Sequence, residues 1–206
     1  LQSVTANFTT NFTNATTALT ANNSTINGPG TLTNAAGQTL TLRQTTFGAT
    51  SALDNQGTLV LNGTVNVNGA LTTAPSTTIR MLPDGTTGFA TLTSASSFTN
   101  NGTIELTSIA STYSAQLSVP GTNTLTNAAG GIITSLVGTG GPRTLDAQLN
   151  NQGLVTLLQP LTLSHASAAH TNSGTIDVSA ADLTLTQSGT APSFTNTGTV
   201  TIDVGR

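Results

Sequence analysis

The stretch FTNNGTIEL, residues 98–106, returns along the chain as HTNSGTIDV at 170–178 and as FTNTGTVTI at 194–202. Looser copies stand at 32–42, 53–61, 125–133 and 149–157. The shared pattern is a large apolar residue, a polar residue, Asn, one or two residues, Gly, and then alternating apolar and polar positions. A recurring unit of this kind indicates a stacked repeat architecture.

The Asn of each copy measures the length of the repeat. These residues are Asn34, Asn55, Asn100, Asn127, Asn151, Asn172 and Asn196, at intervals of 21, 45, 27, 24, 21 and 24 residues. The interval of 45 covers two repeats, and we place the missing copy in IRMLPDGTTGFATL, residues 79–92. Helical repeats keep a nearly fixed length above about 30 residues, whereas a variable period near 22 suits one coil of a β-helix. A leucine-rich repeat is the second choice, but its LxxLxL spacing is missing.

Each half of the motif has a structural reason. Asn and Gly accept positive φ, so we expect them to form corners at which the chain changes direction. The alternation after each corner is typical of a strand with one buried side. Expected inward residues include Ile176, Val178, Leu183 and Leu185, and the sets Leu59, Leu61, Val65, Val67 and Val155, Leu157, Leu161, Leu163. The sequence therefore predicts an all-β protein, a right-handed parallel β-helix (β-solenoid) with irregular coils of about 21–27 residues.

Composition excludes several classes of function. Charged residues make up 5% of the chain, Lys is absent, and the cations are Arg43, Arg80, Arg143 and Arg206. Nucleic-acid binding needs several phosphate contacts from basic residues, so no nucleic acid is expected as a partner. There is no run of 18 apolar residues, and we expect no membrane span in this sequence. The chain also lacks Cys, which excludes disulfides and thiolate metal sites.

Domain organisation follows from the continuity of the repeat. We expect one β-solenoid domain over residues 1–206, with residues 1–31 as a less regular first coil or cap. Neither end carries a recognisable polar cap, and a solenoid with open ends exposes strand edges and core. We therefore expect the chain to be a fragment of a longer repetitive protein. End-to-end stacking of coils from two copies is a further expectation.

The FTNxGTI and LTNAAG strings resemble those of large bacterial surface proteins with right-handed β-helix passengers. These include autotransporter passengers and filamentous-haemagglutinin-like adhesins. The resemblance covers most of the chain at the level of the motif and supplies no site residues. It implies secretion, an elongated shape, an extracellular or cell-surface location, and a role in attachment.

Candidate chemistry in the chain is sparse. Glu105, Asp177 and Asp203 occupy similar places in their copies, and Asp177 and Asp203 are expected to be neighbours on the outer surface. Clustered carboxylates are what polysaccharide-active β-helix enzymes use, but outward solvated acids explain the same pattern. His165 and His170 lack an evident third metal ligand, and His170 fills the slot that Phe98 and Phe194 fill elsewhere. We expect no catalytic residue, no metal and no cofactor, and hence no enzyme.

The function expected is that of a structural or adhesive extracellular segment of a bacterial surface protein or fibre. The alternative is a carbohydrate-binding solenoid face, with host or environmental glycans as partners and Tyr113, in a longer insertion, as the possible ligand contact. Ice binding through Thr-x-Thr arrays is a further alternative, because Thr supplies 46 residues, but Thr is also a favourable exposed strand residue. A polysaccharide-active enzyme is the last alternative.

Overall fold

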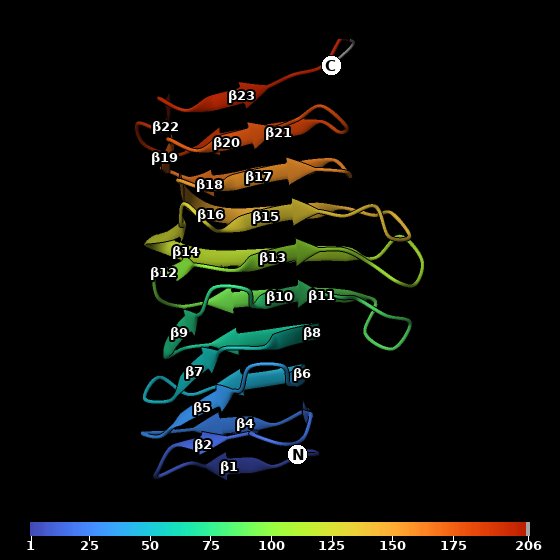
Figure 1. Ribbon diagram of the computed structural model, residues 1–206, viewed down its shortest axis with the longest axis vertical. Coiled ribbons are helices and arrows are strands. Elements are labelled where there is room, and N and C mark those ends of the chain that lie inside the picture. Colours follow the sequence, from blue (N-terminus) through green and yellow to red (C-terminus); the bar gives the residue numbers. More distant parts are fainter. Residues whose placement is uncertain (205–206) are drawn as a thin grey trace.

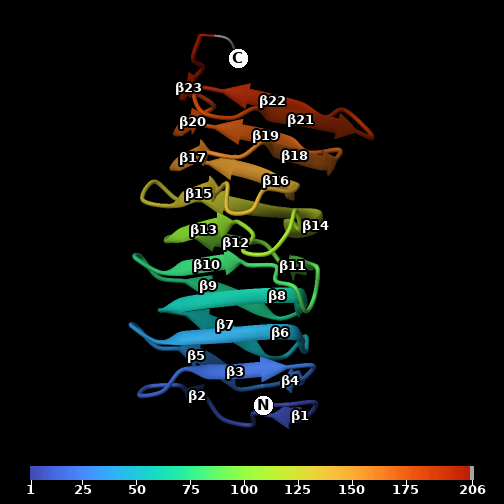
Figure 2. The same ribbon diagram turned by 90° about the vertical axis from the view of Figure 1, so that its right-hand side faces the viewer.

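The computed structural model describes residues 1–204 and is built of parallel strands stacked in about nine coils (Figure 1). Within that range there is no helix, so no helix is present that could cross a membrane. The stack rises steadily from the N-terminal coil to the C-terminal coil, and Figure 2 shows the same order from the side. The predicted all-β solenoid is thereby confirmed.

Each coil contributes to three stacks of strands, here named face A, face B and face C. Face A holds β3 (Leu19–Asn22), the first halves of β6 (Thr39–Phe47) and β8 (Thr58–Val67), β10 (Thr78–Met81), β13 (Thr103–Leu106), β15 (Ile132–Ser135), β17 (Leu154–Leu157), β20 (Thr175–Asp177) and β23 (Thr199–Thr201).

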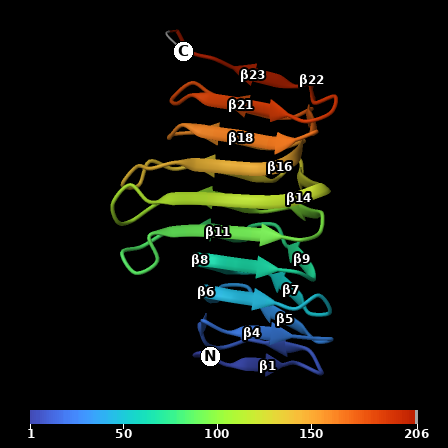
Figure 3. The same cartoon turned by 180° about the vertical axis from the view of Figure 1, so that it is seen from behind.

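Face B, seen in Figure 3, holds β1 (Thr5–Asn7), β4 (Thr25–Asn27), the second halves of β6 and β8, β11 (Phe89–Ser94), the first halves of β14 (Ser114–Asn127) and β16 (Arg143–Asn151), β18 (Leu161–Ala166) and β21 (Leu183–Ser188). Face C holds β2 (Phe12–Thr13), β5 (Thr31–Asn34), β7 (Ala52–Asn55), β9 (Ala70–Thr73), β12 (Phe98–Asn100), the second halves of β14 and β16, β19 (Ala169–Asn172) and β22 (Ser193–Asn196).

The core is a column of inward aliphatic side chains that continues from coil to coil. Strand alternation sends every second residue inward, as in β8, where Leu59, Leu61, Val65 and Val67 are fully buried. The expected inward sets are buried except in β21, where Leu183 is only half-buried. Leu185 is 39% exposed, because its strand β21 pairs with β18 on one side only.

A ladder of amides, buried except at its last member, Asn196, runs beside this core at the corner between face C and face A. In each pair, Nδ2 of one Asn donates to Oδ1 of the Asn in the next coil, over 2.6–2.9 Å. The members are Asn14, Asn34, Asn55, Asn100, Asn127, Asn151, Asn172 and Asn196. Most also donate to the backbone of the face A strand in the next coil, as Asn127 of β14 does to the carbonyl of Leu154 in β17 (3.1 Å). The ladder explains why Asn holds one fixed place in the repeat.

Most motif glycines have a different role from the one predicted. Gly37 adopts the positive φ expected at the corners (75°), but the ladder Asn residues and Gly131, Gly153 and Gly174 do not. A Cβ added to Gly153 would lie 2.2 Å from the carbonyl oxygen of Gly131, and one added to Gly174 would lie 2.1 Å from that of Gly153. The corner therefore needs glycine because successive coils touch there through their backbones.

Two other expectations need correction. The missing ladder position lies at Thr73, which pairs in register with Asn55, and not within residues 79–92. Asp177 is aligned with Thr201 rather than with Asp203, so the expected pair of neighbouring carboxylates does not form. The hydrogen bonds between β20 and β23 fix which residues face each other, and residue 203 lies beyond the end of β23.

Candidate functional site

Three successive coils carry long loops at the corner between face A and face B. Residues 82–88 follow β10, residues 107–113 follow β13 and residues 136–142 follow β15. At the same corner of the lower coils, β6 and β8 run through without leaving the strand. The three loops project together from one edge of the stack in Figure 1 and are named here the loop ridge. Loops held on a rigid scaffold are where binding residues concentrate.

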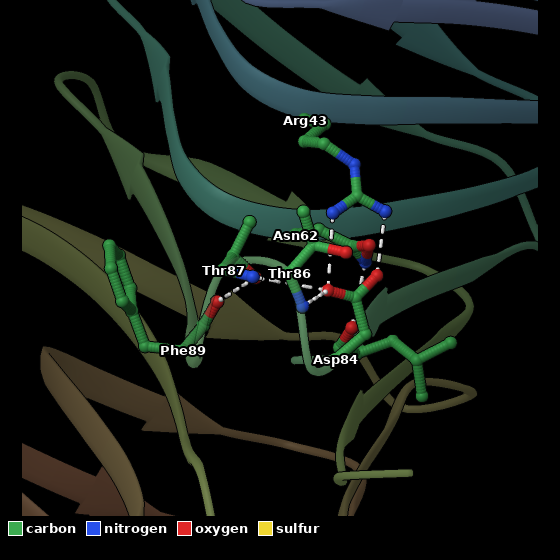
Figure 4. A network of polar contacts seen from close by, with 7 residues as sticks. Arg43, Asn62, Asp84, Thr86, Thr87 and Phe89 are labelled. Carbon is green, nitrogen blue, oxygen red and sulfur yellow. Dashed lines mark hydrogen bonds and ion pairs between the residues drawn. The ribbon is translucent and has the colours of Figure 1, made fainter. Parts of the chain in front are cut away.

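The first loop is clamped to the solenoid by an ion pair (Figure 4). Arg43, on β6, donates from Nη1 and Nη2 to the two carboxylate oxygens of Asp84, over 3.1 and 2.6 Å. Between them lies the intervening coil, whose Asn62 donates from Nδ2 to the carbonyl of Leu82 (2.7 Å). The loop therefore folds down across one coil and is fixed to the next.

Asp84 also organises the loop from within. Its Oδ1 accepts hydrogen bonds from the backbone N–H groups of Thr86 (2.9 Å) and Thr87 (3.2 Å). The hydrogen bonds from Arg43, opposed by burial and aided by these two amides, lower the pKa of Asp84 to about 2. The carboxylate is thus charged, and the clamp intact, at all ordinary pH values.

The second and third loops are held by a buried arginine. Arg143 is 1% exposed, and its guanidinium donates to backbone carbonyls only. The acceptors are the carbonyls of Leu106, Tyr113, Leu136, Val137, Gly141 and Pro142, at 3.1–3.3 Å. Burial lowers the pKa of Arg143. A fork of N–H donors suits this task, because it can bond to several backbone carbonyls at once.

The three loops also bond to each other. Ile109 donates its backbone N–H to the carbonyl of Pro83 (3.4 Å), and Thr139 donates to that of Ser108 (2.9 Å). The half-buried ring of Tyr113 lies against Gly88, since a Cβ placed there would be 3.7 Å from Tyr113 Cε1. The ridge is therefore a packed extension of the coil stack.

The outward side of the ridge is apolar. Ile109 is 61% exposed and Val137 is 52% exposed, and Leu158, at the same corner of the next coil, is 48% exposed. The three side chains belong to successive coils and lie at the same corner, after the last residues of β13, β15 and β17. On a surface that is otherwise mostly Thr, Asn and Ser, exposed aliphatic side chains at one corner of three successive coils mark a contact surface.

The histidines have separate structural roles. His165 Nδ1 lies 2.8 Å from Oδ1 of Asp146 and its Nε2 lies 2.8 Å from the carbonyl of Gly121, so both ring nitrogens face acceptors. Burial lowers the pKa of His165, but those two hydrogen bonds outweigh burial and leave the pKa raised. His170 is fully buried in line with Leu149 and Phe194, as its place in the repeat indicated, and burial lowers its pKa.

Several of these features escaped the sequence reasoning. Asn14 begins the ladder, and the string FTN at residues 12–14 matches the repeat within the segment expected to be irregular. Arg143 and the pair Arg43–Asp84 gave no signal in the sequence. The residues that they join are far apart along the chain, by 41 positions for Arg43 and Asp84, and share no motif. Tyr113 belongs to the ridge, whereas the predicted Asn residues are buried inside the solenoid, except for Asn196, which is exposed in the last coil.

Comparison with known proteins adds no relative: no family model, curated protein or solved structure matches this chain. Within residues 1–204, no group of three or more His, Asp and Glu side chains is placed to hold a metal ion.

Proposed function

We propose that the chain is a rigid scaffold segment of an extracellular bacterial surface structure, and that it presents the loop ridge for attachment. The observation that carries this proposal is the contrast between the two parts of each coil. The core and most of the amide ladder repeat through the stack, whereas long loops emerge from three consecutive coils at one corner. A stack of identical strand contacts gives stiffness, and the ridge gives one defined place for contact.

The anchoring of the ridge supports display as its role. Two of the four arginines hold loops in place, one through Asp84 and one through six backbone carbonyls. Ordering a loop costs backbone entropy, and the anchors offset that cost before any partner arrives. A preorganised surface with exposed aliphatic side chains, beside faces that carry few charges, fits attachment to another surface.

A bead assay tests attachment. Beads coated with the chain should adhere to cells or to an immobilised extracellular surface, and a variant with Ile109→Asp and Val137→Asp should lose most of that adhesion. The matched control changes Ala129 and Ala169, which are exposed away from the ridge, to Asp. Equal adhesion of the two variants, or adhesion no greater than that of bare beads, would contradict the proposal. Antibody labelling of intact producing cells tests the surface location.

Carbohydrate binding at the ridge is the second candidate, and Tyr113 is the observation in its favour, because its ring lies on the ridge beside Gly88. Loss of glycan binding on Tyr113→Ala, with binding kept in the Ala129→Asp control, would support it. Absence of binding across a glycan screen would remove it. Self-association by stacking of end coils stays a prediction, and sedimentation velocity at increasing concentration measures it directly.

A further inference from the structure

Face C is interrupted between β9 and β12. Below the interruption, β2, β5, β7 and β9 form a separate four-stranded sheet, and above it β12 pairs with β14. Among residues 1–204 no strand pairing joins β9 to β12, although faces A and B continue past this level through β8, β10 and β11. Strand pairing is therefore continuous on faces A and B and is interrupted on face C.

The interruption coincides with the missing Asn of the ladder. Thr73 occupies that position, and its hydroxyl donates to the carbonyl of Thr99 (3.0 Å) and accepts from the backbone N–H of Asn101 (2.9 Å). Oδ1 of Asn100, which is fully buried, consequently has no hydrogen-bond partner. A side chain has taken the place of backbone pairing between the two coils.

Backbone groups of β9 and β12 face each other here without a strand ladder between them. In a parallel ladder the peptide groups of alternate residues point to opposite neighbours. Ala74 donates down to Asn55, so the N–H and C=O of Leu71 point up toward β12. Asn100 accepts from Ala128 above it, so the N–H of Thr99 points down toward β9. Open strand edges are hydrogen-bonding surfaces that attract a ligand or another chain.

A cleft of about 480 Å³ opens along this gap, within the size range of small-molecule sites. Its lining side chains are uncharged. Hydroxyl and amide groups come from Asn68, Thr72, Ser97, Thr99 and Asn101, and methyl groups come from Ala49 and Ala70. The hydrogen bond from Thr73 to Thr99 holds the strands too close together for a whole extra strand to enter between them.

We infer that this cleft binds a neutral saccharide. Sugar hydroxyls both donate and accept, so one ligand lying in the cleft can bond to the hydroxyl and amide groups that line it. The alanine methyls offer apolar contact for the C–H side of a pyranose ring. An anionic ligand would find no opposite charge in the lining, where Thr72 donates to the carboxylate of Asp54 (2.8 Å), and its desolvation would go uncompensated. The inference adds a site to the proposed scaffold and rests on it only for a stable solenoid.

The test is an NMR titration of the intact ¹⁵N-labelled chain with neutral tetrasaccharides of glucose, mannose, xylose and N-acetylglucosamine. At least one should shift the amides of Leu71 and Thr99 in a saturable manner. Ala70→Gln should weaken that binding at least tenfold by filling the cleft. Ala169→Gln is the matched control, because it changes the equivalent outward position of β19 and should leave binding unaltered. Gln is compatible with this position, since Gln148 occupies it in β16.

Each contrary result has a distinct meaning. A well-dispersed spectrum that none of the four sugars shifts would overturn the saccharide site and leave the scaffold standing. Shifts confined to the loop ridge, or equal loss of binding in Ala70→Gln and Ala169→Gln, would also overturn it. A spectrum without β-sheet dispersion would instead contradict the solenoid on which both proposals depend.

Discussion

The upper ladder, from Asn100 to Asn196, and the lower ladder, from Asn14 to Asn55, are built from the same residue in the same place, yet they do not meet. Thr73 stands between them. Within each run, the amide chain accompanies unbroken strand pairing on face C, and at Thr73 both are lost. The comparison teaches that the ladder and the sheet are kept or lost together in this fold.

The difference lies in what the two side chains can donate. An amide has two N–H donors and an acceptor oxygen, so it can continue the ladder and also bond to the backbone of the next strand. A hydroxyl has one donor, and Thr73 uses it on Thr99. Consecutive hydrogen bonds in such a ladder polarise and strengthen one another, whereas a break leaves a buried group without a hydrogen-bond partner, as at Oδ1 of Asn100.

The largest effect is expected from breaking the upper ladder. Asn127 takes part in four hydrogen bonds, with Asn100, Gly131, Asn151 and Leu154. Its replacement by Ala leaves buried partners unsatisfied and should lower the free energy of unfolding by about 4 kcal/mol. Urea denaturation measures the loss.

The matched change in the lower ladder is Asn55→Ala. Asn55 makes two such bonds, with Asn34 and with the carbonyl of Thr78, and its loss should cost about 2 kcal/mol. Equal costs for Asn127→Ala and Asn55→Ala would show that the two ladder regions do not differ in the way described.

The corner glycines should behave alike on both sides of the break. A Cβ at Gly131 would lie 2.5 Å from the carbonyl oxygen of Asn100, and one at Gly57 would lie 2.4 Å from that of Ala35. Each Gly→Ala change should destabilise by about 2–3 kcal/mol, because the contacting atoms are backbone. Gly130→Ala is the control: its Cβ meets nothing within 4 Å, so stability should stay within about 0.5 kcal/mol.

Repairing the break should stabilise the protein. In the variant Thr73→Asn, Nδ2 can donate to the unpartnered Oδ1 of Asn100 and Oδ1 can accept from Asn55. The gain should be about 1 kcal/mol, with slower hydrogen exchange at Leu71 and Thr99. Thr126→Asn, on the exposed side of β14, serves as a control and should change neither. A loss of stability in Thr73→Asn would mean that the gap is held open by more than one side chain.

The smallest effects concern pH and fall on the upper region alone, since His165 and His170 both lie there. The pKa of His170 is lowered, so its contribution makes stability fall as pH drops below 6.5, and His170→Leu should abolish that contribution. The pKa of His165 is raised, so its contribution is present below 6.5 and lost at higher pH. His165→Gln should therefore make the protein more sensitive to acid.

Melting temperatures measured between about pH 5 and pH 8 at constant ionic strength separate the two histidines. A variant His170→Leu that loses stability in acid as the wild type does would contradict the assignment of His170 as the acid-sensitive group.

The repeat made much of the fold predictable. Asn at one place and period-2 alternation after it indicated coils, a corner and the inward residues, because both signals are local in the sequence. The close backbone approach at Gly153 was not predictable, since it depends on the distance between coils. Thr73 was missed because it replaces the residue that defines the repeat. The ridge anchors were missed because Arg43 and Asp84 are matched by geometry alone.

Native-state hydrogen exchange, resolved by residue, tests the central claim most directly. We predict that strands β12 to β19 exchange as one strongly protected block on face C, that β5 and β7 form a second protected group, and that the amides of Leu71 and Thr99 between them exchange fast. Uniform protection from β7 through β14 on face C would contradict the account, because it would show that the sheet is continuous across Thr73.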